Sequence, residues 1–141
     1  MDRIKKLFIP VTIFTLAGCA DMVPPDYSQI KLNPHYDECR EFADKVYKNG
    51  GYVEFVDDWI VTMNEKKART IVSGCVVAME KGSVQEIKTD INLKAARYGL
   101  LAGMCTSTDC EFDSEQELKA YTLGSYYSAF KKFPEQLKTS Y

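Results

Sequence analysis

Histidine and tryptophan are nearly missing from this chain, which has one of each among 141 residues. Ser-His-Asp and Cys-His catalytic arrangements both need an imidazole, so His35 would have to serve any of them alone. His35 stands beside Pro34 in the first turn of a predicted helix, where we interpret it as a surface residue. A phosphate-binding loop, a nucleophile elbow and a dinucleotide fingerprint are also missing. These absences favour a role without catalysis, and we assign no catalytic residue.

The chain has neither an excess of positive charge nor a hydrophobic run of membrane-spanning length. Its 18 Lys and Arg are outnumbered by 20 Asp and Glu, whereas nucleic-acid-binding domains usually carry a basic patch. The apolar run Leu7–Leu16 has ten residues, and a membrane-spanning helix needs about 20. We therefore predict no nucleic-acid partner and no resident transmembrane helix. The length allows one compact domain and excludes a multidomain enzyme.

The N-terminus has the features of a cleaved export signal. Arg3, Lys5 and Lys6 form a basic segment ahead of the apolar run. Leu16-Ala17-Gly18-Cys19 follows at once and resembles the lipobox of bacterial lipoprotein precursors. The resemblance implies that residues 1–18 are removed, that Cys19 carries diacylglycerol through a thioether, and that its new amino group receives a fatty acid. The alternative is an ordinary secretory signal that ends near a cysteine.

The residues after Cys19 bear on the choice of membrane. By resemblance to sorting in enterobacteria, an Asp directly after the lipidated cysteine would retain the protein at the inner membrane. Ala20 occupies that position and Asp21 the next one, which favours the periplasmic face of the outer membrane. Removal of residues 1–18 leaves 15 basic against 19 acidic residues and a charge of −4. Charge would not hold such a domain on anionic lipid, so the acyl chains have to anchor it.

The mature chain divides into a tether over residues 19–33 and a globular domain over residues 34–141. The first part contains Pro24-Pro25 and no apolar periodicity, and adjacent prolines favour an extended chain. Beyond it, apolar residues recur at helical spacing. We predict an all-α fold, a small disulfide-braced bundle of about five helices.

Capping residues and glycines suggest where these helices begin and end. The pairs Ser83/Glu86 and Ser114/Glu117 have capping-box spacing, and Asn64 is a candidate N-cap. One segment is ambiguous, since its aromatic and β-branched residues make a strand the competing prediction, but the alternation that a strand needs fails at its centre. That segment is the second of the five predicted helices, which cover residues 34–48, 52–63, 64–82, 83–104 and 114–133.

Four cysteines remain once Cys19 is acylated, an even number in an oxidising compartment. Cys39 and Cys75 each lie on the apolar face of a predicted helix, and Cys105 and Cys110 flank a short polar loop. Of the three connectivities that four cysteines allow, we favour Cys39–Cys75 with Cys105–Cys110. Zinc sites of four cysteines usually have two close pairs, and here only Cys105 and Cys110 are close, with four residues between them. No pair has the two intervening residues of a redox Cys-x-x-Cys motif. We predict no metal and no cofactor.

Two further patterns, clusters of acidic residues and a pair of glycines, are candidates for a catalytic site and a helix contact. Asp57-Asp58 and Glu111–Asp113 are the nearest approach to the paired acids of a glycosidase. Adjacent acids on a helix point in different directions, so we interpret both groups as solvated surface. Gly99 and Gly103 have GxxxG spacing in a stretch too short to span a membrane, which we interpret as close helix packing inside the bundle.

Aromatic residues are concentrated in the last predicted helix. Tyr126 and Tyr127 are consecutive, so a helix turns them about 100° apart and both cannot face one core. Tyrosine is enriched at binding hot spots, although a generous core would also account for most of these residues. We predict that part of a partner-binding surface lies here, drawn from Tyr121, Tyr126, Tyr127, Phe130 and Phe133.

The combination of an export signal, disulfide-braced helices and no catalytic motif is similar to that of several small lipoproteins of the bacterial envelope. These groups include secretion pilotins, immunity proteins that neutralise effectors, and exclusion lipoproteins of phages or plasmids. We therefore predict that the chain binds another envelope or secreted protein, to inhibit it or to help assemble it. The rival hypotheses are a cell-wall hydrolase that uses acidic residues and a structural or phage-type envelope lipoprotein.

Overall fold

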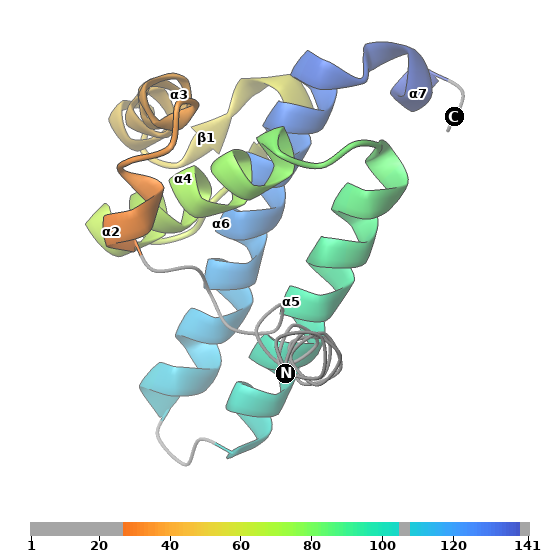
Figure 1. Ribbon diagram of the computed structural model, residues 1–141. Coiled ribbons are helices and arrows are strands. Elements are labelled where there is room, and N and C mark those ends of the chain that lie inside the picture. Colours follow the sequence, from red (N-terminus) through yellow and green to blue (C-terminus); the bar gives the residue numbers. More distant parts are fainter. Residues whose placement is uncertain (1–26, 105–107, 139–141) are drawn as a thin grey trace, which may run out of the picture.

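The computed structural model describes residues 27–104 and 108–138 (Figure 1). Six helices and one short β-hairpin make up this part of the chain, which confirms the predicted small helical fold. The elements are α2 (Tyr27–Ile30), α3 (Tyr36–Lys48), β1 (Tyr52–Val53), the 3-10 turn η1 (Glu54–Val56), β2 (Asp58–Trp59), α4 (Glu65–Met79), α5 (Val84–Met104), α6 (Thr108–Lys132) and α7 (Pro134–Lys138).

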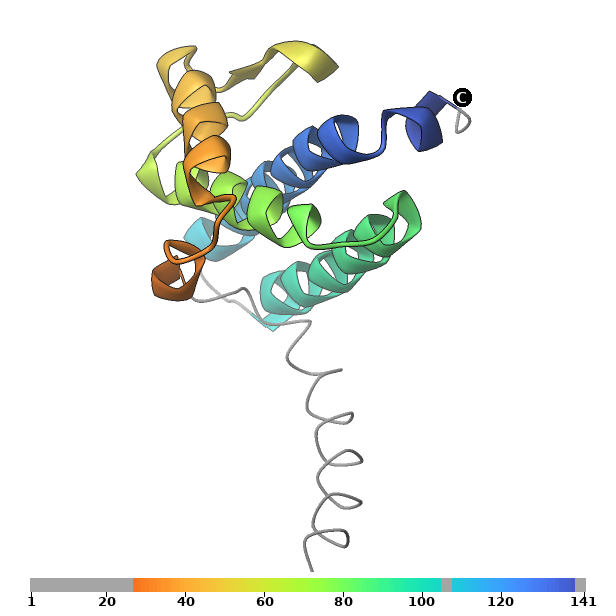
Figure 2. The same ribbon diagram turned by 45° about the horizontal axis from the view of Figure 1, so that its top comes forward.

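The two longest helices, α5 and α6, lie side by side as an antiparallel pair (Figures 1 and 2). Helix α4 crosses α6 and separates it from α2, while α3 packs on α4. The antiparallel hairpin β1–β2 lies beside α3 and runs along α6, because Asp58 bonds to Lys119 and Phe55 contacts Phe130 further along that helix. The main core lies where α3, α4, α6 and the hairpin meet.

Helix α4 is the central element because both of its ends are tied down and most of its surface is buried. The side chain of Asn64 accepts a hydrogen bond from the backbone N–H of Lys67 at 2.9 Å, which confirms Asn64 as the N-cap. At the other end, the Lys132 ammonium donates to the carbonyl oxygens of Met79 and Lys81. A cation at a helix C-terminus also complements the helix dipole.

Helices α4 and α6 approach each other so closely that glycine is required on both. A Cβ atom at Gly74 would lie 2.1 Å from the carbonyl oxygen of Tyr121, and one at Gly124 would lie 2.1 Å from that of Ile71. The hydroxyl of Ser128 donates to the Cys75 carbonyl oxygen across the same contact, at 2.6 Å. We call this contact the glycine seam.

A disulfide joins α3 to α4, as predicted. Cys39 and Cys75 are both fully buried, with their Cα atoms 5.7 Å apart. This geometry is that of an ordinary protein disulfide. Cys105 lies outside the described residues, so the Cys105–Cys110 bridge stays a prediction. The surroundings of Gly99 and Gly103 within α5 also lie outside what the structure describes.

The helix predicted over residues 52–63 is wrong, because this segment forms the hairpin instead. Gly50 and Gly51 both have positive φ, and a Cβ at Gly51 would lie 2.2 Å from the Ile60 carbonyl oxygen. The Ile60 N–H donates to the Gly51 carbonyl at 2.8 Å, and Asp57 takes the left-handed conformation at the tip. The glycines therefore end α3 and lead the chain into β1, whereas the reversal between the two strands lies at η1 and Asp57.

The boundaries at both ends of the bundle also differ from prediction. Residues 27–33, which we assigned to the tether, belong to the folded body, because Ile30 of α2 is buried in the main core. Helix α6 begins at Thr108, so Ser114 and Glu117 lie inside it and form no capping box. The Ser83/Glu86 pair does cap α5, since the Glu86 N–H donates to the Ser83 hydroxyl.

Candidate functional site

An open groove of about 740 Å³ lies between α3, the hairpin and the C-terminal half of α6. Five aromatic side chains line it, and we call the four whose rings contact one another its floor, namely Phe42, Phe55, Tyr127 and Phe130. We call the hollow and these residues the aromatic groove. Its size lies in the range of small-molecule and peptide side-chain sites, about 300 to 1,000 Å³.

The four rings pack on one another in a continuous row. Phe42 and Tyr127 stack with their centroids 4.1 Å apart and their planes 10° from parallel. Phe55 meets Phe130 edge to face at 5.1 Å and lies 5.8 Å from Phe42. Aromatic pairs in such geometries stabilise each other by about 0.5–1.5 kcal/mol beyond their buried area. The floor is therefore preorganised before any partner arrives.

Two of these rings remain open to solvent. The side chains of Phe55 and Phe130 are each 38% exposed, while Phe42 is buried beneath them. Neighbouring exposed apolar side chains around a concave surface are typical of interaction sites, whereas single exposed ones are ordinary. The pair Phe55 and Phe130 therefore marks the part of the groove that a partner can contact.

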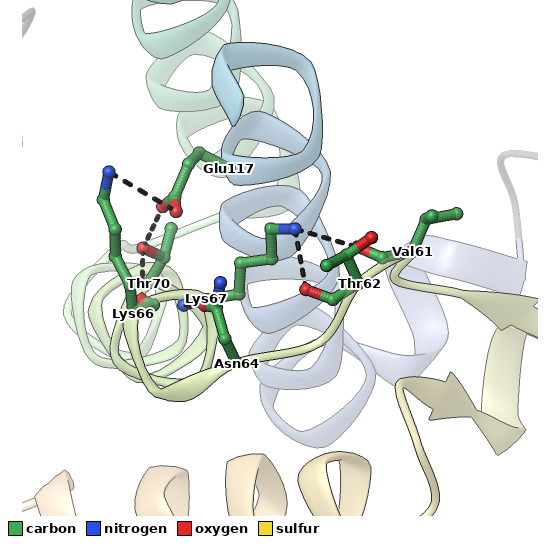
Figure 3. Close-up of polar contacts among 7 residues, drawn as sticks. All are labelled: Val61, Thr62, Asn64, Lys66, Lys67, Thr70 and Glu117. Atoms are coloured by element: carbon green, nitrogen blue, oxygen red, sulfur yellow. Dashed lines mark hydrogen bonds and ion pairs between the residues drawn. The ribbon is translucent and has the colours of Figure 1, made fainter. Parts of the chain in front are cut away.

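The hairpin that carries Phe55 is fixed to α4 by a buried lysine (Figure 3). The Lys67 side chain is 1% exposed, and its ammonium donates to the carbonyl oxygens of Val61 and Thr62 at 2.8 Å each. Buried charges are tolerated only when such partners replace water. Lys67 thus holds the chain directly after β2 against the start of α4.

A second set of contacts in Figure 3 fixes α4 against α6. The buried carboxylate of Glu117 accepts a hydrogen bond from the Thr70 hydroxyl, and the Lys66 ammonium lies 4.0 Å from it. Next to Glu117, the side chain of Gln116 accepts a hydrogen bond from the Val61 N–H at 2.9 Å. The groove wall formed by the hairpin is therefore tied to both helices.

Two acidic residues of the hairpin, Asp57 and Asp58, make contacts that stabilise the hairpin itself. Asp57 accepts a hydrogen bond from the Tyr52 hydroxyl at 2.8 Å, which raises the pKa of Tyr52. Asp58 accepts one from Lys119 at 2.9 Å, and this bond lowers the pKa of Asp58. Both carboxylates of the predicted Asp57-Asp58 cluster thus make contacts that shape the hairpin. The side chains of Glu111–Asp113 lie outside the described part.

Three lysines border the aromatic groove. Lys45 and Lys48 are one turn apart on α3, and Lys131 lies on α6 beside Phe130. All three are exposed, and the Lys131 ammonium lies 5.7 Å from the centre of the Tyr127 ring. Glu54 is the one acidic side chain that also lines the groove. The rim is therefore positive, although the chain as a whole is acidic.

The Tyr127 hydroxyl lies at the edge of the row of rings. It is 3.5 Å from a carboxylate oxygen of Glu38. Burial, followed by the charge of Glu38, raises the pKa of Tyr127 above its ordinary value. Tyr127 therefore stays protonated at neutral pH and presents a neutral ring to the groove.

Of the five aromatic residues predicted to bind a partner, Tyr127 and Phe130 line the aromatic groove. Tyr126 is half-buried and lies outside the lining. Tyr121 is 1% exposed, and the half-buried Phe133 packs against the smaller core cluster. Neither of these two residues lines the groove. A long helix with three neighbours has more than one buried face. The number of aromatic residues in its sequence does not tell which of them lie on a buried face and which line the groove.

Tyr121 belongs instead to a buried polar cluster between α5 and α6. Its hydroxyl donates to Asp90 at 2.6 Å, and the Lys94 ammonium bonds to the other oxygen of Asp90 at 3.0 Å. All three side chains are buried, and Lys94 also lies over the Tyr121 ring. The cluster neutralises its own charge and joins the two long helices.

Sequence reasoning missed half of the groove floor and the whole positive rim. Phe42 falls in the first predicted helix and Phe55 in the second, which does not form, and neither residue was among the predicted binding residues. The turn of the hairpin lies at Glu54–Asp57 and contains no glycine, so it carries no strong turn signal. Residues 42, 55 and 127 are far apart in the chain, so no local pattern could bring them together.

Comparisons with protein-family models, with curated proteins and with solved structures find no match. None of the helices within residues 27–104 and 108–138 is both long enough and apolar enough to cross a bilayer. Within the same residues, no three His, Cys, Asp or Glu side chains gather as a metal-binding group.

Proposed function

We propose that this chain is a lipid-anchored lipoprotein of the bacterial envelope that binds another envelope protein through the aromatic groove. The role is that of a binding protein, which inhibits its partner or helps to assemble it. The observation that carries the proposal is a preorganised row of four aromatic rings, two of them open to solvent, beside a groove of about 740 Å³.

The groove suits a protein partner because aromatic side chains at the centre of an interface contribute most of its binding energy. Phe55 and Phe130 are held by their neighbours, so binding costs little side-chain entropy. The disulfide at Cys39 lies one turn before Phe42 and holds that wall in place. A site that is rigid before binding favours recognition of one defined shape.

The N-terminal sequence supports the proposed location. Leu16-Ala17-Gly18-Cys19 follows a basic segment and a short apolar run, and Ala20 follows the cysteine. Acyl chains on Cys19 would hold the protein at the periplasmic face of the outer membrane. The residues between Cys19 and Tyr27 would then separate the folded body from the lipid surface.

Replacing the lipidated residue tests the location. Cys19→Ser should leave an unprocessed precursor that takes up no labelled fatty acid, because the thioether needs the Cys19 sulfur. The wild-type protein should fractionate with the outer membrane. Normal acylation of the variant would contradict the lipobox assignment, and recovery of wild type in the inner membrane would contradict the sorting alone.

Replacing an exposed ring of the groove tests the binding function. Phe130→Ala should reduce recovery of a stoichiometric protein partner from detergent-solubilised envelopes, since loss of a hot-spot ring costs about 1–3 kcal/mol of binding. Leu32→Ala is the matched control, because Leu32 is 79% exposed and lies outside the groove. Equal recovery with both variants would show that the groove is not the binding site.

A further inference from the structure

We propose that the aromatic groove accepts an acidic segment of the partner protein, anchored by one aromatic or long aliphatic side chain. This inference rests on the proposed function, since it names the chemistry of the partner at the same groove. The apolar floor determines the anchor, and the lysine rim determines the charge around it.

The lysines at the rim of the groove have no acidic partner of their own. Within the described residues, no carboxylate lies within 4.0 Å of the ammonium groups of Lys45, Lys48 or Lys131. Other lysines of this protein are engaged, as Lys119 is with Asp58 at 2.9 Å. The positive charge around the groove is therefore available to an outside carboxylate.

The rim lysines lie on both sides of the aromatic floor. Lys45 and Lys48 project from α3, which carries Phe42, and Lys131 projects from α6 next to Phe130. An extended or helical segment that places an apolar side chain on the floor would have its flanking carboxylates near one wall or the other. Two carboxylates oppose this charge, that of Glu54 at the hairpin side and that of Glu38 beside the Tyr127 hydroxyl.

The lysine rim also disfavours a second copy of this chain and a basic partner as occupants of the groove. A second copy docked groove to groove would bring the two lysine rims together, because a twofold contact pairs the same patch with itself. Such like-charge contacts are costly. A basic partner would meet the same repulsion. An anionic membrane surface shares the charge of the proposed segment but offers no single anchor for a concave aromatic floor, and it is an outcome of the test.

The probe is a random peptide library displayed on phage, selected against the full protein purified in mild detergent. We expect the selected peptides to be rich in Asp and Glu around one aromatic or aliphatic residue. Their affinity should fall with added salt, because exposed charges are screened. It should also fall about tenfold or more when the rim charges are removed. The rim variant is Lys45→Gln with Lys48→Gln and Lys131→Gln.

The matched control removes three charges outside the groove, in a variant that combines Lys31→Gln, Lys81→Gln and Lys88→Gln. Its affinity for the selected peptides should change less than about twofold, because none of these three lysines lines the groove and salt screens exposed charges. Thermal unfolding of both variants establishes that they fold. Equal losses from both variants would contradict a specific role for the rim.

The composition of the selected peptides separates the two proposals. Neutral or basic peptides whose binding depends on Phe130 would overturn the acidic segment and leave the groove as a binding site. Failure to select any peptide that depends on Phe130 would overturn both. Binding of the protein to phosphatidylglycerol vesicles, lost in the rim variant and without such peptides, would assign the rim to lipid and overturn the inference.

Discussion

Helix α6 presents two different faces, and each uses residues of a different size. Toward α4 it places Ala120, Gly124 and Ser128, at successive intervals of four, and all three are buried. Toward α3 and the hairpin it places Tyr127 and Phe130, which are partly exposed. Small residues let two backbones meet without space between them, whereas the large rings from three elements keep their backbones apart and border a hollow.

The two faces also treat polar groups differently. In the glycine seam, the hydroxyls of Ser125 and Ser128 donate to the carbonyl oxygens of Gly74 and Cys75, so hydrogen bonds replace lost water. At the aromatic groove, the lysines remain exposed. The seam therefore stabilises the domain, whereas the groove leaves aromatic rings and charged side chains exposed to solvent.

The largest expected effect comes from cutting the covalent link between the two regions. Cys39→Ala with Cys75→Ala should lower the free energy of unfolding by about 4 kcal/mol, because the bridge closes a loop across a separation of 36 residues. Denaturant unfolding measures the loss. Hydrogen exchange should rise in α3 more than in α6, since α6 keeps the glycine seam. A uniform rise would contradict this division.

Adding one methyl group to the seam should have the next largest effect. Gly124→Ala should cost about 3 kcal/mol of unfolding free energy, because its Cβ would lie 2.1 Å from a backbone oxygen that cannot move alone. Gly82→Ala is the control, since its Cβ would lie 3.4 Å from the flexible end of Glu86. Similar stabilities for the two variants would mean that the helices separate easily.

The groove floor should tolerate change better than the seam. Tyr127→Ala should cost about 2 kcal/mol, less than a fully buried ring, because Tyr127 stacks on Phe42 but is partly exposed. Tyr127→Phe keeps the stack and loses only the hydroxyl near Glu38, so it should fold and bind nearly as wild type. Tyr126→Ala provides the neighbouring control and should leave binding unchanged. Reversed results for Tyr126 and Tyr127 would move the binding surface off the groove.

The smallest effect concerns the ion pair that joins the hairpin to α6. The hydrogen bond from Lys119 lowers the pKa of Asp58, so its contribution is complete above the unfolded value of about 3.9. It disappears as the pH falls through the lower pKa of the folded state. Asp58→Asn should therefore cost at most about 1 kcal/mol at neutral pH and nothing in acid, since both side chains are partly solvated. Glu115→Gln, an exposed acid on α6, should show no such pH dependence.

Local signals predicted the parts of the fold that local chemistry determines. Asn64 caps α4 and Ser83 caps α5 because a side-chain oxygen accepts a nearby backbone N–H, which depends only on close neighbours. The Cys39–Cys75 bridge followed from two cysteines on apolar helix faces. The hairpin was missed because its apolar residues have helical spacing and its turn, Glu54–Asp57, lacks glycine.

Contacts between distant segments could not be predicted from these patterns. The spacing of Gly99 and Gly103 drew attention to α5, while the close crossing that the structure describes uses Gly74 and Gly124 on two other helices. Ala120, Gly124 and Ser128 repeat at four-residue intervals, a pattern of small residues that was present in the sequence. The burial of Tyr121 depends on Asp90 of another helix, and no rule of spacing links them.

The central claim is that a partner protein occupies the aromatic groove in the cell envelope. Site-specific photocrosslinking tests it most directly, with a photoreactive phenylalanine analogue in place of Phe55 or Phe130 and, as the control, in place of Leu32. The account predicts one discrete protein adduct from the two groove positions and none from the control. No adduct at Phe55 and Phe130, or an equal adduct at Leu32, would contradict it.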